Sequence, residues 1–365
     1  MDLIQWVPNL PPRIDGIGDY ALKLAHRLRD QHSIQTHFLV GNPHWTGPDI
    51  IEGFPARALD SRSPAAVRQA LTQLPHAPHL LHFVVYGYHK RGCPVWLLNA
   101  LTDLHASGTH LHTAFHELEA HSWKPWSSVF WTSPIQKSLL RRLARISTFR
   151  YTNLELHRNR LHRWGSGPVA LIPNFSTLGE PQSLPPFAQR NRHLILFGRP
   201  AQRQLTLQHG GKHILPLCRL LGIERILDIG APIPGHSLSD WQGIPITHTG
   251  RLSEAEIQHL FSTSLASFQH YPIHALGKSS IYAVSCAFGT LPFIHSDTPD
   301  LHACPPLVPG DDFFPVHFPH QPPQADHELF SNPTHLAHLS ERLFHRYQMR
   351  NSAVAAQTIA AQLRR

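Results

Sequence analysis

The sequence predicts an α/β protein made of two doubly wound domains. Short apolar runs with strand character alternate with amphipathic segments of helical spacing along nearly the whole chain. The length of 365 residues exceeds that of one typical domain. Residues 176–192 are rich in proline and polar side chains and separate two such series of segments. Strands that alternate with helices form a mostly parallel sheet with helices on both faces.

The composition fits a protein with ample cores in a reducing compartment. Hydrophobic residues make up 41% of the chain, yet no apolar run is long enough to cross a membrane. The N-terminal residues have neither a basic start nor a cleavage site, so we expect no signal peptide. The four cysteines lie far apart and form no CxxC pair, which argues against a disulfide framework or a zinc knuckle. We therefore expect a cytoplasmic protein.

The charge of the chain favours an anionic partner. The formal net charge is +8, and most of the basic residues are arginine. A basic surface is typical of proteins that bind a nucleotide, a nucleic acid or a membrane lipid, and the charge alone does not choose among them. Histidine is so abundant, with 31 residues, that any single histidine is weak evidence of a site.

The first domain begins with a strand, a glycine-containing loop and a helix. Residues 2–7 have strand character, and residues 20–29 have helical spacing. Gly16 and Gly18 lie between them, where glycine permits a close approach of the backbone. This order is typical of a phosphate-binding turn. Because the motif is not GxGxxG, a tight turn without a ligand remains an open alternative.

Two side chains at the end of a later strand are candidates for a catalytic site. We expect further strands and helices of this domain at residues 36–40, 64–74, 80–85, 96–107, 111–115, 139–145, 148–152 and 169–172, with another helix that starts at Asn153. His116 and Glu117 follow directly after the strand at 111–115. Ligands of open α/β sheets bind beyond the carboxyl ends of the strands. The alternative for His116 is a packed histidine at a strand end.

A zinc site is a weaker interpretation of the same region. His110, His112, His116 and His121 are close in sequence, and a metal site needs about four converging ligands. The first two of these histidines fall on an otherwise apolar strand, and no cysteine joins them. We therefore expect no metal site.

A cluster of aromatic residues precedes the arginine-rich helix at 139–145. Trp123, Trp126 and Trp131 lie within nine residues, beside Lys124 and several arginines. One interpretation is a set of core aromatics with a solvated basic face. The other is a segment that docks on a membrane surface and brings the protein to a lipid-linked acceptor.

The second domain contains a second candidate phosphate site. We expect its strands and helices at residues 193–197, 214–221, 225–229, 246–249, 253–263, 265–268, 281–288 and 291–294, followed by two C-terminal helices at 333–347 and 351–364. Lys278, Ser279 and Ser280 come at the start of the helix at 281–288, where backbone N–H groups and a lysine suit an anion. The alternative is an ordinary capped helix with a solvated lysine. A P-loop is excluded, because Pro272 stands where that motif needs glycine.

The order of the local motifs resembles that of glycosyltransferases of the GT-B fold, of the family-four (glycosyltransferase group 1) type. The segments that carry the resemblance are DGIGDYA (15–21), FHE (115–117), LIPNF (171–175), FGR (197–199), GRLSEAE (250–256) and AFGTLP (287–292). Each motif is loose, but their order extends over nearly the whole chain. The resemblance implies an N-terminal acceptor domain (1–180), a C-terminal donor domain (190–332) and terminal helices (333–365) that pack back across the domains.

The resemblance also implies roles for individual residues. The donor is a nucleotide-diphosphate sugar, whose phosphates would be approached by Gly16 and Gly18 and bound by Arg199. His116 would lie beside the transferred sugar. The acceptor is a glycan or a lipid-linked glycan. No DxD motif occurs, which fits an enzyme that requires no metal or other cofactor.

The sequence departs from this family in one diagnostic motif. The Glu-x7-Glu pair of the family would fall near Leu276 and Val284, and neither is acidic. The lysine expected after the Gly-Arg pair falls at Gln204, and Arg203 would substitute for it. Lys278 and the helix start would then hold the diphosphate. The sequence thus leaves a second hypothesis open, a catalytically inactive protein of the same fold that binds a nucleotide or sugar or serves as a scaffold. A nucleic-acid-binding protein is disfavoured, because no binding motif accompanies the charge.

Overall fold

Two sheets organise the chain, each within its own folded unit. The computed structural model describes residues 1–13, 15–235, 238–297, 307–317 and 329–364. Unit 1 comprises Met1–Pro173 and Ser352–Arg365, and unit 2 comprises Asn174–Asn351. The chain therefore passes into unit 2 directly after Pro173, ahead of the proline-rich stretch that we expected at the boundary. The expected C-terminal helix pair is divided between the units.

The sheet of unit 1 runs in the order β3-β4-β2-β1-β5-β6-β7-β8. All neighbouring strands are parallel except β3 and β4, which form an antiparallel pair that the sequence did not predict. The strands are β1 (Asp2–Val7), β2 (Gln35–Val40), β3 (Ile50–Ile51), β4 (Phe54–Ala58), β5 (His79–Phe83), β6 (Leu111–Phe115), β7 (Phe149–Thr152) and β8 (Val169–Leu171). The central strands are buried on both faces, so apolar residues predominate in them without strict alternation with polar ones.

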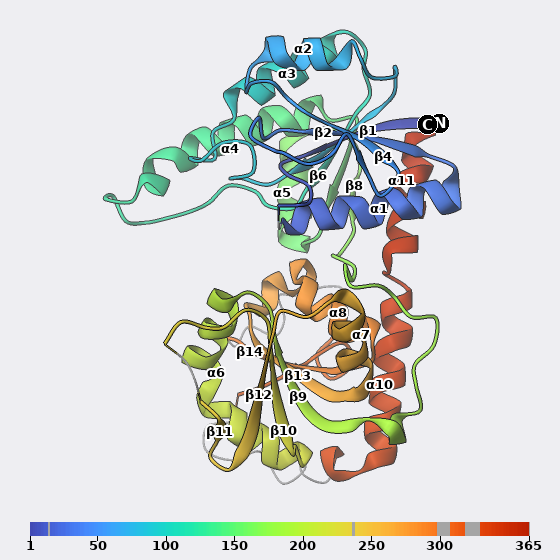
Figure 1. The fold of residues 1–365 in the computed structure, drawn as a ribbon. Coiled ribbons are helices and arrows are strands. Elements are labelled where there is room, and N and C mark those ends of the chain that lie inside the picture. Colours follow the sequence, from blue (N-terminus) through green and yellow to red (C-terminus); the bar gives the residue numbers. More distant parts are fainter. Residues whose placement is uncertain (14, 236–237, 298–306, 318–328, 365) are drawn as a thin grey trace. The chain divides into compact units, whose positions relative to one another are not determined.

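Helices cover both faces of this sheet. They are α1 (Gly16–His32), α2 (Pro64–Leu71), α3 (Val95–Ala106), α4 (Ser128–Ile146), α5 (Glu155–Trp164) and α11 (Ser352–Leu363). One face packs against α2, α3, α4 and α5 through a single apolar core. The other face packs against α1, and α11 lies beside α1, where the Arg27 side chain donates to Ser352 Oγ at 2.8 Å (Figure 1).

The sheet of unit 2 runs in the order β11-β12-β10-β9-β13-β14-β15. The strands are β9 (Asn191–Phe197), β10 (Arg225–Ile229), β11 (Asp240–Trp241), β12 (Ile244–Gly250), β13 (Ser264–His270), β14 (Leu291–His295) and β15 (Phe314–Pro315). All pairs are parallel except β11 with β12. This order places β9 in the centre of the sheet, between β10 and β13.

The helices of unit 2 also cover both faces of its sheet. They are the 3₁₀ helices η1 (Phe187–Gln189) and η2 (Ile273–Lys278) and the helices α6 (Pro200–Leu221), α7 (Glu254–Thr263), α8 (Ser280–Ala287) and α10 (Pro333–Gln348). Apolar residues of α6 pack on one face, and those of α7 and α8 pack on the other. Both units are thus doubly wound, as the sequence predicts. Residues 298–306 and 318–328, between the expected strand at 291–294 and the expected helix at 333–347, lie outside the described residues.

Two helices are longer than their sequence patterns indicate. The pattern predicts helices at 139–145 and 214–221, whereas α4 begins at Ser128 and α6 at Pro200. The added turns contain exposed polar and aromatic residues and two glycines, so they lack a regular apolar stripe. Among the described residues, no helix combines the length and apolarity needed to cross a bilayer.

Candidate functional site

His116 lies directly after β6, at the carboxyl edge of the sheet of unit 1. Its side chain is 6% exposed, and its backbone N–H still donates to Phe83 O of the neighbouring strand. Because side chains alternate along β6, His116 and His112 share the face covered by α1, whereas Phe115 faces the core on the other side. The predicted position at a strand end is confirmed, and the side chain is buried.

A chain of polar side chains crosses four adjacent strands to reach His116. Gln5 Nε2 donates to Thr36 Oγ1 at 2.9 Å, and Gln5 Oε1 lies 2.8 Å from His82 Nε2. His82 Nδ1 lies 3.1 Å from His116 Nε2. The strands that carry these residues are neighbours in the order β2-β1-β5-β6, and Figure 1 labels β2, β1 and β6 in this sheet. Sequence reasoning missed Gln5 and His82, because a polar residue inside a single strand gives no signal of its partners.

This chain fixes which nitrogen atoms carry protons. The amide oxygen of Gln5 can only accept, so His82 Nε2 carries hydrogen. Burial lowers the pKa of His82 well below its ordinary value, and His116 adds to this effect, so the ring is neutral and its Nδ1 accepts. His116 Nε2 must then donate to His82 Nδ1. The buried chain therefore holds a proton of His116 on Nε2, which donates to His82.

Tyr20 of α1 closes this region from one side. Its ring meets His116 edge-on with a centroid distance of 5.0 Å, and burial raises the pKa of its hydroxyl. A cavity of about 10 Å³ lies beside these rings and is also lined by Thr152, Asn153 and Ile359. This volume matches about one water molecule. The edge of unit 1 by itself thus offers a place for a small polar atom next to His116, and no room for a whole sugar.

The acidic candidates of unit 1 have different surroundings. Glu117 is partly exposed and follows His116 at the strand end. Glu119, which is nearly buried, forms an ion pair with Arg160. The Glu119 carboxylate is therefore engaged by Arg160, and Glu117 is the acid that directly follows His116.

The two predicted glycines begin α1. Gly18 is required for packing, because a Cβ there would lie 2.5 Å from Asn9 O. Gly16 is exposed, and a Cβ there would meet no atom within 4 Å. Asp15 caps the helix by accepting from Ile17 N at 3.0 Å. The role of these glycines at the donor phosphates stays a prediction. Of the two, Gly16 is the one whose backbone is exposed to solvent.

In unit 2, the turn after β9 and the start of α8 lie against each other. Gly198 has φ +129°, and a Cβ there would lie 2.8 Å from Ile281 Cδ1. Arg199 follows as the exposed residue before α6, and Pro200 occupies the first position of that helix. The N-terminal ends of α6 and α8 therefore lie close together, and both carry the positive end of a helix dipole.

The loop before α8 is held by a residue of the LIPNF segment. Asn174 N donates to Gly277 O and Asn174 Nδ2 donates to Lys278 O, both at 2.8 Å. Ser279 caps α8, because its Oγ accepts from Tyr282 N at 3.2 Å. The prediction of an N-cap in this pair of serines is confirmed for Ser279, which is buried, whereas Ser280 is the exposed first residue of the helix. Asn174 was missed as a site residue, although its motif had been noticed.

Arg203 has a different environment from the one its predicted role requires. Its side chain is 1% exposed and pairs with Asp228. It also donates to Gly198 O at 3.0 Å and to Ala231 O. The guanidinium thus ties the ends of β9 and β10 together from inside the unit. Its part in diphosphate binding stays a prediction, and these contacts give it a structural role.

The positions that correspond to the missing glutamates point into the core. Leu276 is 0% exposed and Val284 is 1% exposed, and both belong to the apolar cluster below α8. An acidic side chain at either position would be buried without a partner. The leucine and the valine thus suit the packing of these two positions.

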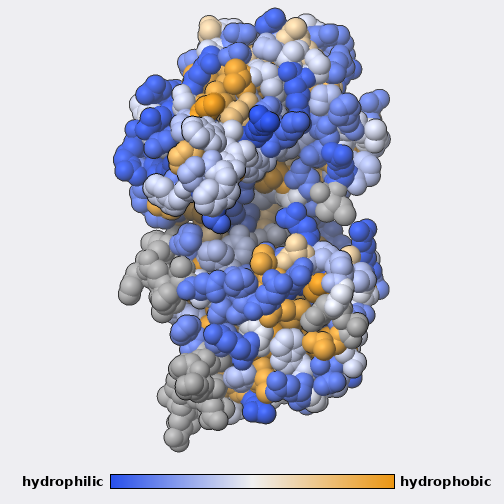
Figure 2. Space-filling view, turned by 90° about the vertical axis from the view of Figure 1, so that its left-hand side faces the viewer, coloured by the Kyte–Doolittle hydropathy of each residue, from blue (hydrophilic) through white to orange (hydrophobic). Residues whose placement is uncertain are grey.

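The tryptophan segment of unit 1 lies on the surface. Trp123, Trp126 and Trp131 are 82%, 83% and 67% exposed. The segment before α4 projects away from the sheet of unit 1 (Figure 1), and Figure 2 looks onto the side toward which it projects, where pale and orange areas lie among blue ones. Trp131 Nε1 donates to Pro125 O at 2.8 Å, which orders the loop. The interpretation of these residues as core aromatics is wrong.

The histidines near β6 do not form a ligand cluster. His112 Nδ1 lies 3.2 Å from Tyr151 Oη, and His116 pairs with His82. Among the described residues, a different group brings three ligand atoms of His, Cys, Asp or Glu within 4.8 Å of one another, namely His209, His270 and Asp297 in unit 2.

The fold is shared with known nucleotide-sugar enzymes, although the sequence is not similar to theirs. No model of a protein family matches the chain, and no curated protein is detectably similar to it. An α-glucosyltransferase in complex with UDP and a 13-mer DNA containing an HMU base has a TM-score of 0.60 at 11% identity, with 100% of this chain and 99% of that chain covered. WaaG, a glycosyltransferase involved in lipopolysaccharide biosynthesis, has a TM-score of 0.54 at 9% identity, with 99% and 98% covered.

A third structure has the same fold and a different reaction. The putative UDP-N-acetylglucosamine 2-epimerase from Listeria monocytogenes has a TM-score of 0.53 at 10% identity, with 99% of this chain and 95% of that chain covered. Both units thus match over nearly their whole length, and the predicted GT-B fold is confirmed. At about 10% identity, these similarities show the fold alone.

Proposed function

We propose that this protein is a glycosyltransferase that moves a sugar from a nucleotide-diphosphate sugar to a glycan or lipid-linked glycan acceptor. Unit 2 binds the donor and unit 1 binds the acceptor. The observation that carries the proposal is the pair of adjacent helix starts in unit 2, with Arg199 at one and Lys278 at the other. Two cations beside two helix N-termini suit a diphosphate.

The donor site in this proposal works by positive charge and backbone N–H groups. Arg199 and Lys278 neutralise the diphosphate as it leaves, with help from the starts of α6 and α8. Ser279 and Ser280 shape the start of α8, and Gly16 lets the backbone of α1 approach the donor. In this proposal no metal ion is needed for transfer, because the cations supply the charge that a metal would supply.

The acceptor side uses the carboxyl edge of unit 1. His116 bonds to the transferred sugar with its proton fixed on Nε2 by His82. Glu117 takes the proton of the attacking hydroxyl. This division of labour follows from burial, because His116 is held in one orientation and Glu117 is accessible.

The exposed tryptophan segment provides the contact with a membrane that carries the acceptor. Trp123, Trp126 and Trp131 are amphipathic rings that favour a bilayer interface. Arg141 and Arg145 on the same helix are exposed and attract anionic headgroups. We propose a cytoplasmic protein that binds the membrane surface peripherally, with no nucleic acid as partner.

The proposal is tested by donor binding and turnover in the full chain. Calorimetry with a panel of nucleoside diphosphates should identify one that binds. The matching sugar nucleotide should release this nucleoside diphosphate when a glycan acceptor is added. If no member of the panel binds or is turned over, the proposal is wrong. Retention of duplex DNA at physiological salt would contradict the absence of a nucleic-acid partner.

A second candidate function is nucleotide or sugar binding without catalysis. It is favoured by the buried, apolar positions of Leu276 and Val284, where the resembling family has glutamates. In that case a nucleoside diphosphate binds, no sugar is transferred or hydrolysed, and His116→Ala has no effect beyond stability. Turnover that depends on His116 excludes this candidate.

A further inference from the structure

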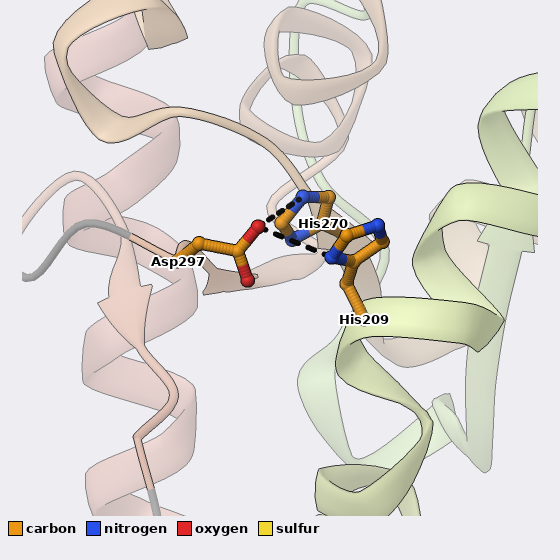
Figure 3. A group of neighbouring side chains, drawn as sticks. All are labelled: His209, His270 and Asp297. Carbon is orange, nitrogen blue, oxygen red and sulfur yellow. Dashed lines mark ion pairs between the residues drawn. The ribbon is translucent and has the colours of Figure 1, made fainter.

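Unit 2 contains a group of side chains that the proposed transfer does not use. His209 lies on α6, His270 ends β13, and Asp297 follows β14. Figure 3 shows the two rings and the carboxylate pointing toward one another from these three elements. His209 and Asp297 are 88 positions apart in the sequence, and no spacing motif predicts the group. The three residues are therefore brought together by the fold.

The distances within this group match those between the ligands of one metal ion. His209 Nδ1 lies 3.1 Å from Asp297 Oδ2, and His270 Nε2 lies 3.6 Å from the same oxygen. Ligands at about 2.0–2.2 Å from a tetrahedral zinc ion lie about 3.3–3.5 Å from one another. All three ligand atoms lie within 4.8 Å of one another, so a modest movement of exposed side chains would complete the geometry.

A second set of contacts holds His270 in place. Its other ring nitrogen, Nδ1, lies 3.0 Å from His295 Nδ1, so Nε2 faces His209 and Asp297. Metal-binding histidines usually have such a partner on the second nitrogen, which fixes the ring. The His295 side chain is 4% exposed, so the ring that supports His270 is itself held inside unit 2.

The backbone of the site is also built for precision. The backbone N–H of His270 donates to Thr206 Oγ1 at 3.1 Å, and its carbonyl accepts from Gln202 Nε2 at 2.9 Å. Gly210 allows α6 to approach the sheet, because a Cβ there would lie 2.8 Å from the Phe268 ring. The His209 ring stacks on the His270 ring at 4.7 Å. The helix that carries one ligand is thus fixed to the strand that carries another.

We propose that His209, His270 and Asp297 form a site for one late first-row transition metal ion, such as Zn²⁺, Co²⁺ or Ni²⁺. Two imidazoles and one carboxylate favour these ions over Mg²⁺ and Ca²⁺, which prefer oxygen ligands. Three protein ligands leave at least one position for water or another small ligand. The site links α6 to the ends of β13 and β14, and it is independent of the proposed transfer reaction.

The test is a metal titration of the untagged full chain after treatment with a chelator. Co²⁺ added to this protein should produce visible ligand-field bands that saturate at one equivalent, and equilibrium dialysis with Zn²⁺ should give the same stoichiometry. Saturating Zn²⁺ should also raise the midpoint of thermal unfolding. Asp297→Ala, at an exposed position, and His270→Gln should each abolish the one-equivalent step.

Two further variants separate a built site from general binding to a histidine-rich chain. His26→Gln removes a surface pair, in which His26 Nε2 lies 2.6 Å from Glu52 Oε2, and should leave the titration unchanged. His295→Gln should weaken binding roughly 10- to 100-fold while the stoichiometry stays at one, as expected for a supporting residue. Binding that survives Asp297→Ala, or an absence of any saturable step, would overturn the proposal.

Discussion

In unit 1, the carboxyl ends of β5 and β6 carry the buried imidazoles of His82 and His116, whereas in unit 2 an exposed cationic turn with Arg199 follows β9. The rings of His82 and His116 are buried and hydrogen-bonded to each other. Arg199 is exposed, and Lys278 follows a backbone loop that Asn174 holds in place. The two sheets have similar doubly wound topology, so the difference comes from a few residues after each strand.

This difference has a chemical consequence for the proposed reaction. A buried imidazole that is held in one orientation suits an uncharged hydroxyl group, because its ring nitrogens can donate or accept a hydrogen bond. A cationic turn at a helix start suits a diphosphate. Two units of the same fold can therefore bind different parts of a nucleotide sugar. In the proposed reaction, the imidazole edge of unit 1 suits the sugar hydroxyls and the cationic turn of unit 2 suits the diphosphate.

The largest expected effect is the loss of His116. His116→Ala should lower turnover roughly 10²- to 10³-fold, because it removes a positioned hydrogen-bonding group beside the transferred sugar. The affinity for the nucleoside diphosphate should stay unchanged, because unit 2 binds it. The measurement is steady-state kinetics with calorimetry on the same samples.

A matched control lies on the same strand and the same face. His112 is also buried, and burial lowers its pKa to about 4, but it bonds to Tyr151 and not to His82. His112→Gln should change turnover only a few-fold. An equal loss in both variants would mean that the imidazoles of unit 1 serve stability and that the comparison between the edges fails.

The second prediction concerns the cationic edge. Removing one charged hydrogen bond costs about 1.5–3 kcal/mol, so Arg199→Ala and Lys278→Ala should each weaken diphosphate binding roughly 10- to 150-fold. Turnover at saturating donor should fall less than for His116→Ala. Isothermal calorimetry gives the dissociation constants.

Arg219→Ala is the control for this prediction. Arg219 is equally exposed on α6 but lies in the last turn of the helix, at the opposite end from Arg199. It should leave the affinity for the diphosphate unchanged. A similar loss for all three variants would indicate a diffuse attraction by the net charge of +8 and would remove the basis for a specific site.

The third prediction uses the neutrality of the imidazoles in unit 1. Burial lowers the pKa of both His79 and His112 from 6.5 to about 4. Because these values lie below the unfolded value, the unfolded chain binds more protons, and stability is complete above pH 6.5 and declines as the pH falls toward 4. At pH 5 each ring should lower the free energy of unfolding by about 2 kcal/mol relative to its value at pH 7.5. His79 also loses a bond on protonation, because its Nδ1 accepts from Trp6 Nε1 at 3.1 Å.

Urea unfolding at pH 7.5 and pH 5 measures this effect. His79→Gln should reduce the difference between the two pH values, although it lowers stability at pH 7.5. The fluorescence of Trp6, in contact with the His79 ring, helps to assign the transition to unit 1. Unfolding midpoints that are equal at both pH values would contradict neutral, buried rings.

The sequence could predict the architecture but only part of the chemistry. Strand and helix periodicity placed β6 and β10 at their observed bounds. The position of His116 at a strand end followed from the same pattern. The pairing of Arg203 with Asp228 could not be predicted, because it depends on how the first turns of α6 pack against the end of β10.

Contacts over long sequence separations account for the other missed residues. Asn174 reaches Lys278 across 104 positions, and Gln5 reaches His82 across 77. No local pattern encodes such pairs, since each depends on which strands the fold makes neighbours. The exposure of Trp126 was also not predictable, because an aromatic cluster fits a core and a surface equally well in sequence.

The smallest expected effect concerns the exposed tryptophan segment of unit 1. Trp126 and Trp131 project from unit 1 and should insert into the interface of anionic vesicles. If each ring buries about 40 Å² of apolar surface at about 25 cal/mol per Å², each contributes about 1 kcal/mol, and each alanine variant should bind about fivefold more weakly.

Met349→Ala, at an exposed apolar position of unit 2, should bind as the unchanged protein does. Vesicle sedimentation measures the partition, and neutral vesicles should bind less because Arg141 and Arg145 lose their attraction. Equal binding by all variants would leave unit 1 without a membrane surface and would favour an acceptor that is free in solution.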